Sequence, residues 1–199
     1  MNLPAKLAVF ISGGGTNLQS LIDASRSGRL SAEIVLVISS KSDAYGLERA
    51  RNAGIDTFVF RMKDYATPED AERDLLEMLE EYEVEYIALA GYLKLVPLAV
   101  VRKYNGRIAN IHPALLPKFG GKGMYGHHVH EAILAAGEKE SGATVHLVDE
   151  IYDNGRILIQ EKVPVLPDDT PDALAARVLL VEHKIYPEAL ENLIRGSYK

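Results

Sequence analysis

The sequence predicts an α/β fold: a doubly wound, mostly parallel sheet with a C-terminal antiparallel hairpin and a closing helix. Short runs rich in β-branched residues alternate with segments of helical periodicity over the first 136 residues. Runs that are apolar throughout are typical of strands buried on both faces of a parallel sheet. Two alternating runs and one long helical pattern follow, and these predict the hairpin and the closing helix.

The sequence pattern predicts alternating strands and helices from residue 6 to residue 136. The runs 6–12 (KLAVFIS) and 33–39 (EIVLVIS) are the clearest strands, and Leu18, Leu21 and Ile22 between them recur at helical spacing. Repetition of this βαβ unit predicts right-handed crossovers. The expected strands are 6–12, 33–39, 57–60, 85–90 and 107–111, and the expected helices are 17–27, 45–52, 68–82, 98–104 and 130–136.

The last part of the chain departs from this alternation. Residues 143–148 and 156–165 alternate apolar and polar side chains and are joined by a short turn, so they predict an antiparallel hairpin. Residues 171–195 then form one long helical pattern. Thr170 precedes this pattern as an N-cap, and Pro171 stands in its first turn, where proline is tolerated.

The composition indicates an ordinary soluble domain. A hydrophobic content of 47% in 199 residues supports one sizeable core, so we expect a single domain spanning residues 1–199. No apolar run approaches the roughly 18–20 residues that span a bilayer, and the N-terminal residues run into a strand instead of a signal peptide. We therefore expect a cytoplasmic protein. The absence of cysteine excludes disulfides and thiolate chemistry, and a net charge of −6 disfavours nucleic acid while leaving room for a local phosphate pocket.

A glycine-rich loop, residues 12–18 (SGGGTNL), joins the first strand to the first helix. Backbone amides at a helix N-terminus attract anions, and glycines let an anion approach closely. Leu18 stands where the dinucleotide fingerprint has its last glycine, and no Gly-Lys-Ser/Thr follows as in a P-loop. The loop therefore favours a phosphate monoester, with side-chain contacts from Thr16 and Asn17. The alternative is a tight strand-to-helix turn without a ligand.

A second polar group ends the strand expected at 107–111. Asn110 and His112 stand there, Pro113 keeps the chain extended, and Asp153 lies in an acidic turn after the next apolar run. Because ligands of open α/β sheets bind beyond the carboxyl ends of the strands, we expect these side chains to meet. Amide and imidazole donors suit an oxyanion, and a carboxylate supports proton transfer, so the group indicates acyl transfer. Taken singly, a structural histidine and a turn-forming aspartate are equally good interpretations.

The remaining polar residues suggest less. His127, His128 and His130 form an HHxH cluster, but it stands in an expected loop without a carboxylate at helical spacing, so we expect no metal site. His146 alternates with apolar neighbours and is expected to face the opposite side of the sheet from them. For Glu182, the simplest interpretation is a solvated helix face.

Six segments match a known pattern in order, from about residue 6 to residue 187. They are 10–18 (FISGGGTNL), 90–94 (AGYLK), 110–117 (NIHPALLP), 142–146 (GATVH), 149–155 (DEIYDNG) and 182–187 (EHKIYP). Together they resemble the phosphoribosylglycinamide formyltransferases, a folate-dependent family of purine synthesis. The Asn-x-His-Pro segment and the acidic turn are shared by the wider formyltransferase superfamily, whereas the glycine loop and the C-terminal glutamate point to this member.

The resemblance implies a reaction and a site. The glycinamide amine of phosphoribosylglycinamide attacks the formyl carbon of the co-substrate 10-formyltetrahydrofolate, without a metal, in a monomer or a homodimer. A phosphate-binding half is implied at about 1–105 and a catalytic and folate-binding half at about 106–199. By motif, the implied residues are Asn110, His112 and Asp153 for catalysis; Gly15, Thr16, Asn17 and Glu182 for phosphoribosylglycinamide; and Leu93, Lys94, Leu95, Val96, Asn110, Val148, Asp149 and Asp153 for the folate.

The acidic turn departs from the family pattern. Tyr152 lengthens it and Arg156 replaces a proline, so Asp153, not Asp149, is aligned with the catalytic carboxylate. The loop at 120–130 is also longer than in compact members.

Three further points concern the folate tail and two other possible functions. No residue clearly corresponds to an arginine that some members use near the folate tail, and Arg61 and Lys63 are the candidates. The nearest rival activity is that of the formyltetrahydrofolate hydrolases, which carry a regulatory domain for which 199 residues leave no space. A non-catalytic nucleotide-binding module would leave Asn110, His112 and Asp153 unexplained.

Overall fold

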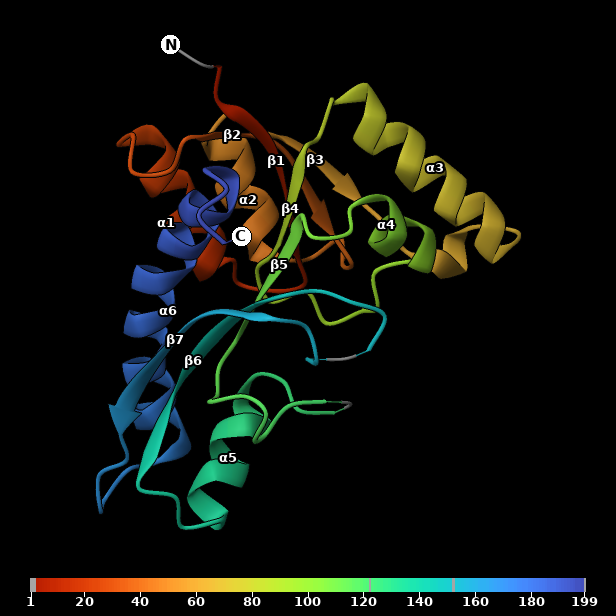
Figure 1. The fold of residues 1–199 in the computed structure, drawn as a ribbon. Helices are drawn as coiled ribbons and strands as arrows, with labels where there is room; N and C mark the ends of the chain where they lie inside the picture. The colour runs from red at the N-terminus through yellow and green to blue at the C-terminus, as the bar shows by residue number, and fades with distance from the viewer. Residues whose placement is uncertain (1–2, 122, 152, 199) are drawn as a thin grey trace.

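A computed structural model describes residues 3–121, 123–151 and 153–198. In these residues the strands form one seven-stranded sheet in the order β3-β2-β1-β4-β5-β6-β7, with helices on both faces (Figure 1). The strands are β1 (Ala5–Ile11), β2 (Ala32–Ser39), β3 (Asp56–Val59), β4 (Tyr86–Leu89), β5 (Ile108–His112), β6 (Glu140–Leu147) and β7 (Ile157–Pro164). The helices are α1 (Thr16–Arg26), α2 (Tyr45–Asn52), α3 (Pro68–Glu81), α4 (Leu98–Lys103), α5 (His127–Ala135) and α6 (Pro171–Ile194), with a 3₁₀ turn at η1 (Met62–Asp64).

The pairing of the strands confirms the predicted fold class. Strand β1 lies between β2 and β4, β3 pairs with β2, and β5 pairs with β4, all in parallel. Strand β6 runs antiparallel to both β5 and β7, so β6 and β7 are the predicted hairpin. The carboxyl ends of β1, β4 and β5 therefore meet at one edge of the sheet.

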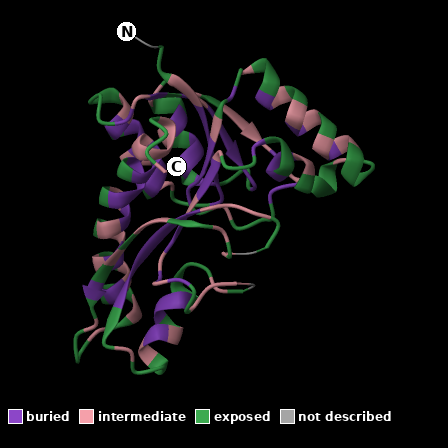
Figure 2. Cartoon of the chain, in the orientation of Figure 1, coloured by how far each residue is buried: buried purple, intermediate pink, exposed green. Residues whose placement is uncertain are grey.

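The sheet separates two apolar cores. On one face, α1, α2 and α6 pack against strand residues such as Val9 and Ala109. On the other face, α3 and α4 pack against Phe10 and Ile108. Because successive strand residues point to opposite faces, the central strands are buried on both sides, as the purple ribbon of Figure 2 shows. This double burial fixes the direction in which each residue of β5 points.

Helix α6 ties the hairpin to the parallel strands. Its N-cap is the predicted Thr170, whose hydroxyl accepts a 3.2 Å hydrogen bond from the Ala173 amide. Farther along, the fully buried Tyr186 hydroxyl lies 3.0 Å from the carbonyl oxygens of both Leu89 and Ala109. One hydroxyl carries one proton, so β4 and β5 share this donor. Among the described helices, α6 included, none is both long and apolar enough to cross a membrane.

Helix α5 differs most from the expectation. It begins at His127, not at His130, so the predicted loop position of His127 and His128 is wrong. The helix was expected to follow a Gly-rich loop, whereas its first turn already begins at the polar residues His127 and His128. The 3₁₀ turn η1 was not expected either. The other boundaries differ by a few residues at most, as helix and strand ends commonly do.

Candidate active site

Polar side chains gather on one face of β5 and β6. Asn110 and His112 alternate with Ala109 and Ile111, which belong to the α1/α2/α6 core, so the two polar side chains face the other side of the sheet. In the antiparallel register, His146 stands beside Asn110, and residue 144 beside His112. The α4 side of the sheet thus carries an amide and two imidazoles at the carboxyl end of β5.

Asp153 completes this group. Its Oδ1 lies 3.5 Å from Asn110 Nδ2 and 3.4 Å from His146 Nε2. Its Oδ2 accepts a 2.8 Å hydrogen bond from the Gly121 amide and lies 3.8 Å from His112 Nδ1. The acidic turn after β6 therefore folds back over the end of β5, as the sequence predicted.

Asp149 has a different role. Its Oδ1 accepts a 2.8 Å hydrogen bond from the Ile151 amide, and its Oδ2 accepts one of 3.1 Å from Asn154 Nδ2. It closes its own turn, so of the two aspartates it is Asp153 that reaches His112. Tyr152, which was expected to lengthen this turn, lies outside the described residues, as does residue 122 in the long loop.

The protonation state of His112 follows from its neighbours. Its Nε2 lies 2.8 Å from the carbonyl oxygen of Phe119, which can only accept, so Nε2 carries a proton. Burial lowers the pKa of His112, and the Asp153 charge opposes this only in part. A neutral ring with its lone pair on Nδ1, facing Asp153, is the form that these contacts favour at neutral pH.

Asp153 is held as the anion. Burial by itself would raise the pKa of this carboxyl group. The neighbouring His146 ring, the hydrogen bond from the Gly121 amide and the His112 ring outweigh burial and lower the pKa. The site thus holds a carboxylate against an imidazole that can accept a proton.

His146 was not among the residues predicted for the site. It faces away from its apolar strand neighbours, as predicted, but that face carries the polar group. Its Nδ1 donates to the Leu147 carbonyl over 2.8 Å, which leaves Nε2 to accept a 3.0 Å hydrogen bond from Asn110 Nδ2. His146 thereby orients the Asn110 amide. The signal was the antiparallel register, which a single sequence does not give.

The glycine loop lies at the carboxyl end of β1. Helix α1 begins at Thr16, with Gly15 as its N-cap at φ 72°, and no side chain caps it. A Cβ added at Gly13 or Gly14 would meet nothing within 4 Å, so the loop is open on that side. Uncapped amides and open space at a helix N-terminus match the expected anion site.

Glu182 lies against this loop and not on a solvated face, so the simplest interpretation of its sequence position is wrong. Asn17 Nδ2 donates to Glu182 Oε2 over 2.5 Å, and the two residues are only 9% and 8% exposed. Burial raises the pKa of Glu182, and the hydrogen bond from Asn17 opposes the rise. Asn17 Oδ1 is also buried and has no hydrogen-bond partner in the described part of the chain. A buried carboxylate and an unpaired acceptor are costly unless a ligand uses them.

Residues 93–96 follow β4 and lie between the glycine loop and the polar group at the end of β5. Leu93 donates its amide to Ser12 Oγ over 2.8 Å, which joins this segment to the glycine loop. Residues 93–95 are exposed, whereas Val96 is buried in the α3/α4 core and offers backbone at most. Val148 packs against the same core, and its amide donates to the Ile108 carbonyl over 2.9 Å. The two expected walls of a folate pocket therefore flank the end of β5.

Arg61 and Lys63, the candidates for a contact with the folate tail, lie after β3. In the sheet, β3 is separated from β4 by β2 and β1. Arg61 pairs with Asp64 over 2.6 Å within the same short turn.

The HHxH cluster lies in the first turn of α5. Within the described ranges, no three His, Cys, Asp or Glu side chains are arranged to hold a metal ion. Glu131 does stand at helical spacing, contrary to expectation: it lies 3.2 Å from His128 and 3.9 Å from His127. His130 points into the protein, where burial, followed by the charges of His127 and His112, lowers its pKa to about 4.

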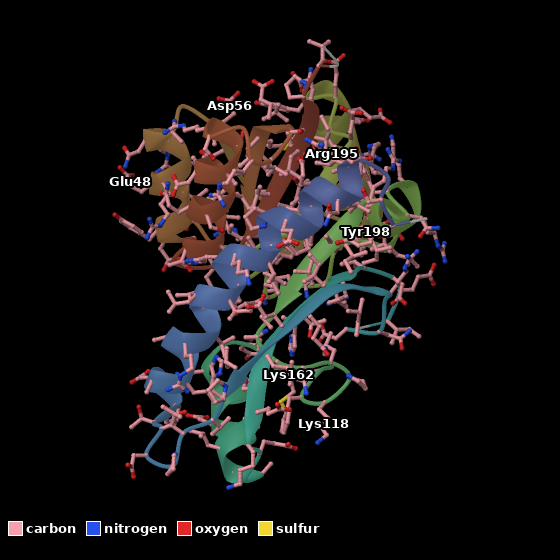
Figure 3. All side chains as sticks on the ribbon, turned by 60° about the vertical axis from the view of Figure 1, so that its left-hand side comes forward. Glu48, Asp56, Lys118, Lys162, Arg195 and Tyr198 are labelled. Atoms are coloured by element: carbon pink, nitrogen blue, oxygen red, sulfur yellow. The ribbon has the colours of Figure 1, made fainter. Side chains whose placement is uncertain are left out.

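A surface hollow of about 930 Å³ lies at the opposite edge of the sheet, where the strands begin. It is lined by residues such as Ala5, Glu85 and Arg195, the last of which is labelled in Figure 3. None of the residues expected in the site borders it. Since parallel sheets bind ligands at the carboxyl ends of their strands, this hollow is not the active site.

Comparison with known proteins defines the class. The family model described as Formyl transferase matches residues 5–190. The chain therefore belongs to the formyl transferases, and its fold is theirs. Within that class, the chain belongs to the phosphoribosylglycinamide formyltransferase family, as three similar proteins show.

The phosphoribosylglycinamide formyltransferase of Haemophilus influenzae is 41% identical over 194 residues, which cover 98% of this chain and 89% of that protein. The chloroplastic enzyme of Vigna unguiculata is 48% identical over 188 residues. The crystal structure of glycinamide ribonucleotide transformylase 1 from Symbiobacterium toebii superposes with a TM-score of 0.91 at 41% identity, covering 98% of this chain and 90% of that one.

The covered length and the identity differ among the similar proteins. The chain spans 60% of the length of the Vigna relative and 64% of that of an Arabidopsis thaliana relative. A formyltetrahydrofolate deformylase from Pseudomonas syringae superposes with a TM-score of 0.85 at 23% identity, which shows a shared fold alone.

Proposed function

We propose that the protein transfers the formyl group of 10-formyltetrahydrofolate to the glycinamide amine of phosphoribosylglycinamide. The products are formylglycinamide ribonucleotide and tetrahydrofolate, and the reaction belongs to purine synthesis. The observation that carries the proposal is the meeting of Asn110, His112 and Asp153 at the end of β5. The relatives named phosphoribosylglycinamide formyltransferase support the choice of substrates.

The acceptor substrate is assigned to the glycine loop and α6. The amides of Gly15, Thr16 and Asn17 bind its phosphate, since they stand at the uncapped N-terminus of α1. Glu182 contacts the glycinamide and ribose end, where hydroxyl and amine donors satisfy a buried carboxylate. Asn17 Oδ1 is available to accept from the same end of the ligand.

The donor is assigned to the space at the end of β5, between the segment after β4 and the turn after β6. Leu93, Lys94, Leu95 and Val96 form one wall of the pterin pocket, and Val148, Asp149 and Asp153 form the other. A pterin is flat and rich in donors and acceptors, so exposed backbone between apolar side chains suits it. Asn110 lies between the walls and close to both substrates.

The chemistry follows from the three polar side chains. The amine attacks the formyl carbon, which creates an oxyanion and a positively charged nitrogen together. Asn110 donates to the oxyanion; loss of one such donor costs roughly 2.7–4 kcal/mol of barrier in other enzymes. His112 takes the proton from the amine and donates this proton toward the oxygen or N10. Asp153 stabilises the imidazolium that forms in between. As the intermediate collapses, the bond from carbon to N10 breaks and N10 gains a proton.

The test is a two-substrate assay. Protein is mixed with phosphoribosylglycinamide and a 10-formyl folate, and the deformylated folate is followed by absorbance. Product that forms only with the ribonucleotide supports the transferase. Folate product that forms equally without it would show a hydrolase and would refute the proposal.

The remaining expectations are predictions from the sequence. We propose a cytoplasmic location, a monomer or homodimer, and no metal in the reaction. The division into a phosphate-binding half at about 1–105 and a catalytic and folate-binding half at about 106–199 is likewise part of the proposal.

A further inference from the structure

The first turn of α2 is packed against the glycine loop. The Gly46 amide donates to the Gly13 carbonyl over 3.0 Å. Arg49, one turn later, donates from Nε to the Gly14 carbonyl over 2.9 Å. Two consecutive carbonyls of the loop therefore point toward α2.

This arrangement sets the direction of the loop amides. In a trans peptide, the carbonyl of one residue and the N–H of the next point in opposite directions. The Gly13 and Gly14 carbonyls face α2, so the N–H groups of Gly14 and Gly15 point away from it. Consecutive amides aimed at one side form an anion-binding concavity, and open space lies beside Gly13 and Gly14.

The backbone of α2 sits very close to the loop. A Cβ added to Gly15 would lie 2.6 Å from Gly46 Cα, and one added to Gly46 would lie 3.3 Å from Gly15 Cα. Only glycine at both positions permits this approach. In Figure 3, the labelled Glu48 marks α2 on the outer surface of the molecule.

The Arg49 side chain is itself fixed. A second nitrogen of its guanidinium donates to Gln19 Oε1 on α1 over 3.3 Å. The guanidinium also stands over the Tyr45 ring, with Cζ 5.1 Å from the ring centroid. The planar, forked guanidinium of Arg49 thus joins the glycine loop to the first turn of α1. A lysine does not reproduce this geometry.

We propose that Arg49 is a positioning residue for the phosphate of the acceptor substrate. It holds the Gly14 peptide so that the loop amides stay directed at the phosphate before the substrate arrives. This inference rests on the proposed function of the glycine loop. It assigns Arg49 to substrate affinity and not to the chemical step.

Substitution of Arg49 tests this role. Arg49→Met removes the donors and keeps the length of the side chain, and we expect the KM for phosphoribosylglycinamide to rise about tenfold, the size of one lost charge-assisted hydrogen bond. The kcat and the KM for the folate should stay within about twofold, since the catalytic residues are untouched. Arg49→Lys should resemble Arg49→Met, because the charge without the fork does not hold both acceptors.

Two comparisons make the result specific. Arg51→Met changes an exposed arginine on the same helix that pairs with Glu48 over 3.5 Å, and it should leave all constants at the wild-type values. The non-phosphorylated acceptor, glycinamide riboside, should react with Arg49→Met and with wild type at rates within about twofold. If Arg49→Met fails to fold, Gln19→Met, which frees one end of the fork, should raise the same KM about threefold.

The outcomes separate the two proposals. A wild-type protein without transferase activity refutes the proposed function. An active wild type whose KM for phosphoribosylglycinamide is unchanged by Arg49→Met and by Gln19→Met overturns the role of Arg49. Equal losses with the riboside and the ribonucleotide would also overturn it, because the effect would not pass through the phosphate. Full recovery of the wild-type KM for phosphoribosylglycinamide in Arg49→Lys would also overturn it, because the positive charge alone would then account for the affinity.

Discussion

Oδ2 of Asp153 lies 3.8 Å from Nδ1 of His112, and the two side chains are only 12% and 5% exposed. The carboxylate is anionic and the imidazole is neutral, since hydrogen bonds lower the pKa of the first and burial lowers the pKa of the second. A charge that is already in place beside a base stabilises the cation when the base takes a proton. The pair is thus arranged to accept a proton from an amine.

Asp153→Asn should reduce kcat by about 10²–10⁴-fold, the range for loss of general acid–base assistance. The asparagine keeps the size of the side chain but removes the charge opposite His112. Asp149→Asn is the matched control: it should keep kcat within a few-fold and affect at most the KM for the folate. Steady-state kinetics of both variants check this. A larger loss of kcat in Asp149→Asn than in Asp153→Asn would reverse the assignment.

His112→Ala should nearly abolish turnover while the protein stays folded, because the residue lies at the end of a strand and not in the centre of either core. Turnover at the wild-type rate would refute the mechanism, and a cooperative melting curve would show that the fold is retained.

The pH profile of His112 has a defined sign. Below its pKa the ring is protonated and no longer accepts a proton, so kcat/KM should fall as the pH drops. The midpoint should lie below 6.5, the ordinary histidine value, because burial lowers the pKa. In Asp153→Asn the residual activity should show this midpoint at still lower pH, since the Asp153 charge raises the pKa of His112. A midpoint above 6.5 would contradict the buried, neutral ring.

The sequence predicted the parts of the site that follow directly from strand order. In a parallel sheet, the ends of β1 and β5 share one edge, so the glycine loop and Asn110 were expected near one another. The segment at 93–96 was implied by the resemblance alone. The polar residues interrupt apolar runs there, which is a local signal. The position of Asp153 followed from the same logic, as the turn after the hairpin's first strand returns to that edge.

The missing parts depend on registers and packing angles that no local signal encodes. His146 joined the site because the antiparallel register placed it opposite Asn110. From the residues alone, Glu182 was expected on a solvated helix face, and only the resemblance assigned it to the substrate. The way α6 packs on α1 turns it inward against Asn17. The start of α5 was missed because polar first turns carry no apolar periodicity.

His146→Phe should lower kcat by about 10–100-fold, less than His112→Ala, because His146 acts through its neighbours. The phenyl ring fills the space but does not accept from Asn110 Nδ2. The amide of Asn110 would then lose its fixed orientation. His146→Gln, which keeps an acceptor and a donor, should recover part of the activity. Equal kcat in wild type and His146→Phe would show that the Asn110 amide is held by other contacts.

Glu182→Gln should separate stability from substrate affinity. Burial raises the folded-state pKa of Glu182, so the unfolded chain releases this proton at a lower pH than the folded protein does. The contribution of Glu182 to stability is therefore fully present below the unfolded-state pKa and is lost as the pH rises through the folded-state pKa. Glutamine does not titrate, and its amide offers a donor to the unpaired Asn17 Oδ1.

The Tm of Glu182→Gln relative to wild type should accordingly be higher at pH 8 than at pH 5, as measured by thermal unfolding. Glu188→Gln, an exposed position on the same helix, should show no such pH-dependent difference. The KM of Glu182→Gln for phosphoribosylglycinamide should nevertheless rise about tenfold, since the charged acceptor is lost. These two results together would show that the charge of Glu182 serves substrate binding and lowers the stability of the folded protein. A variant less stable than wild type by the same amount at both pH values would instead make Glu182 a structural residue.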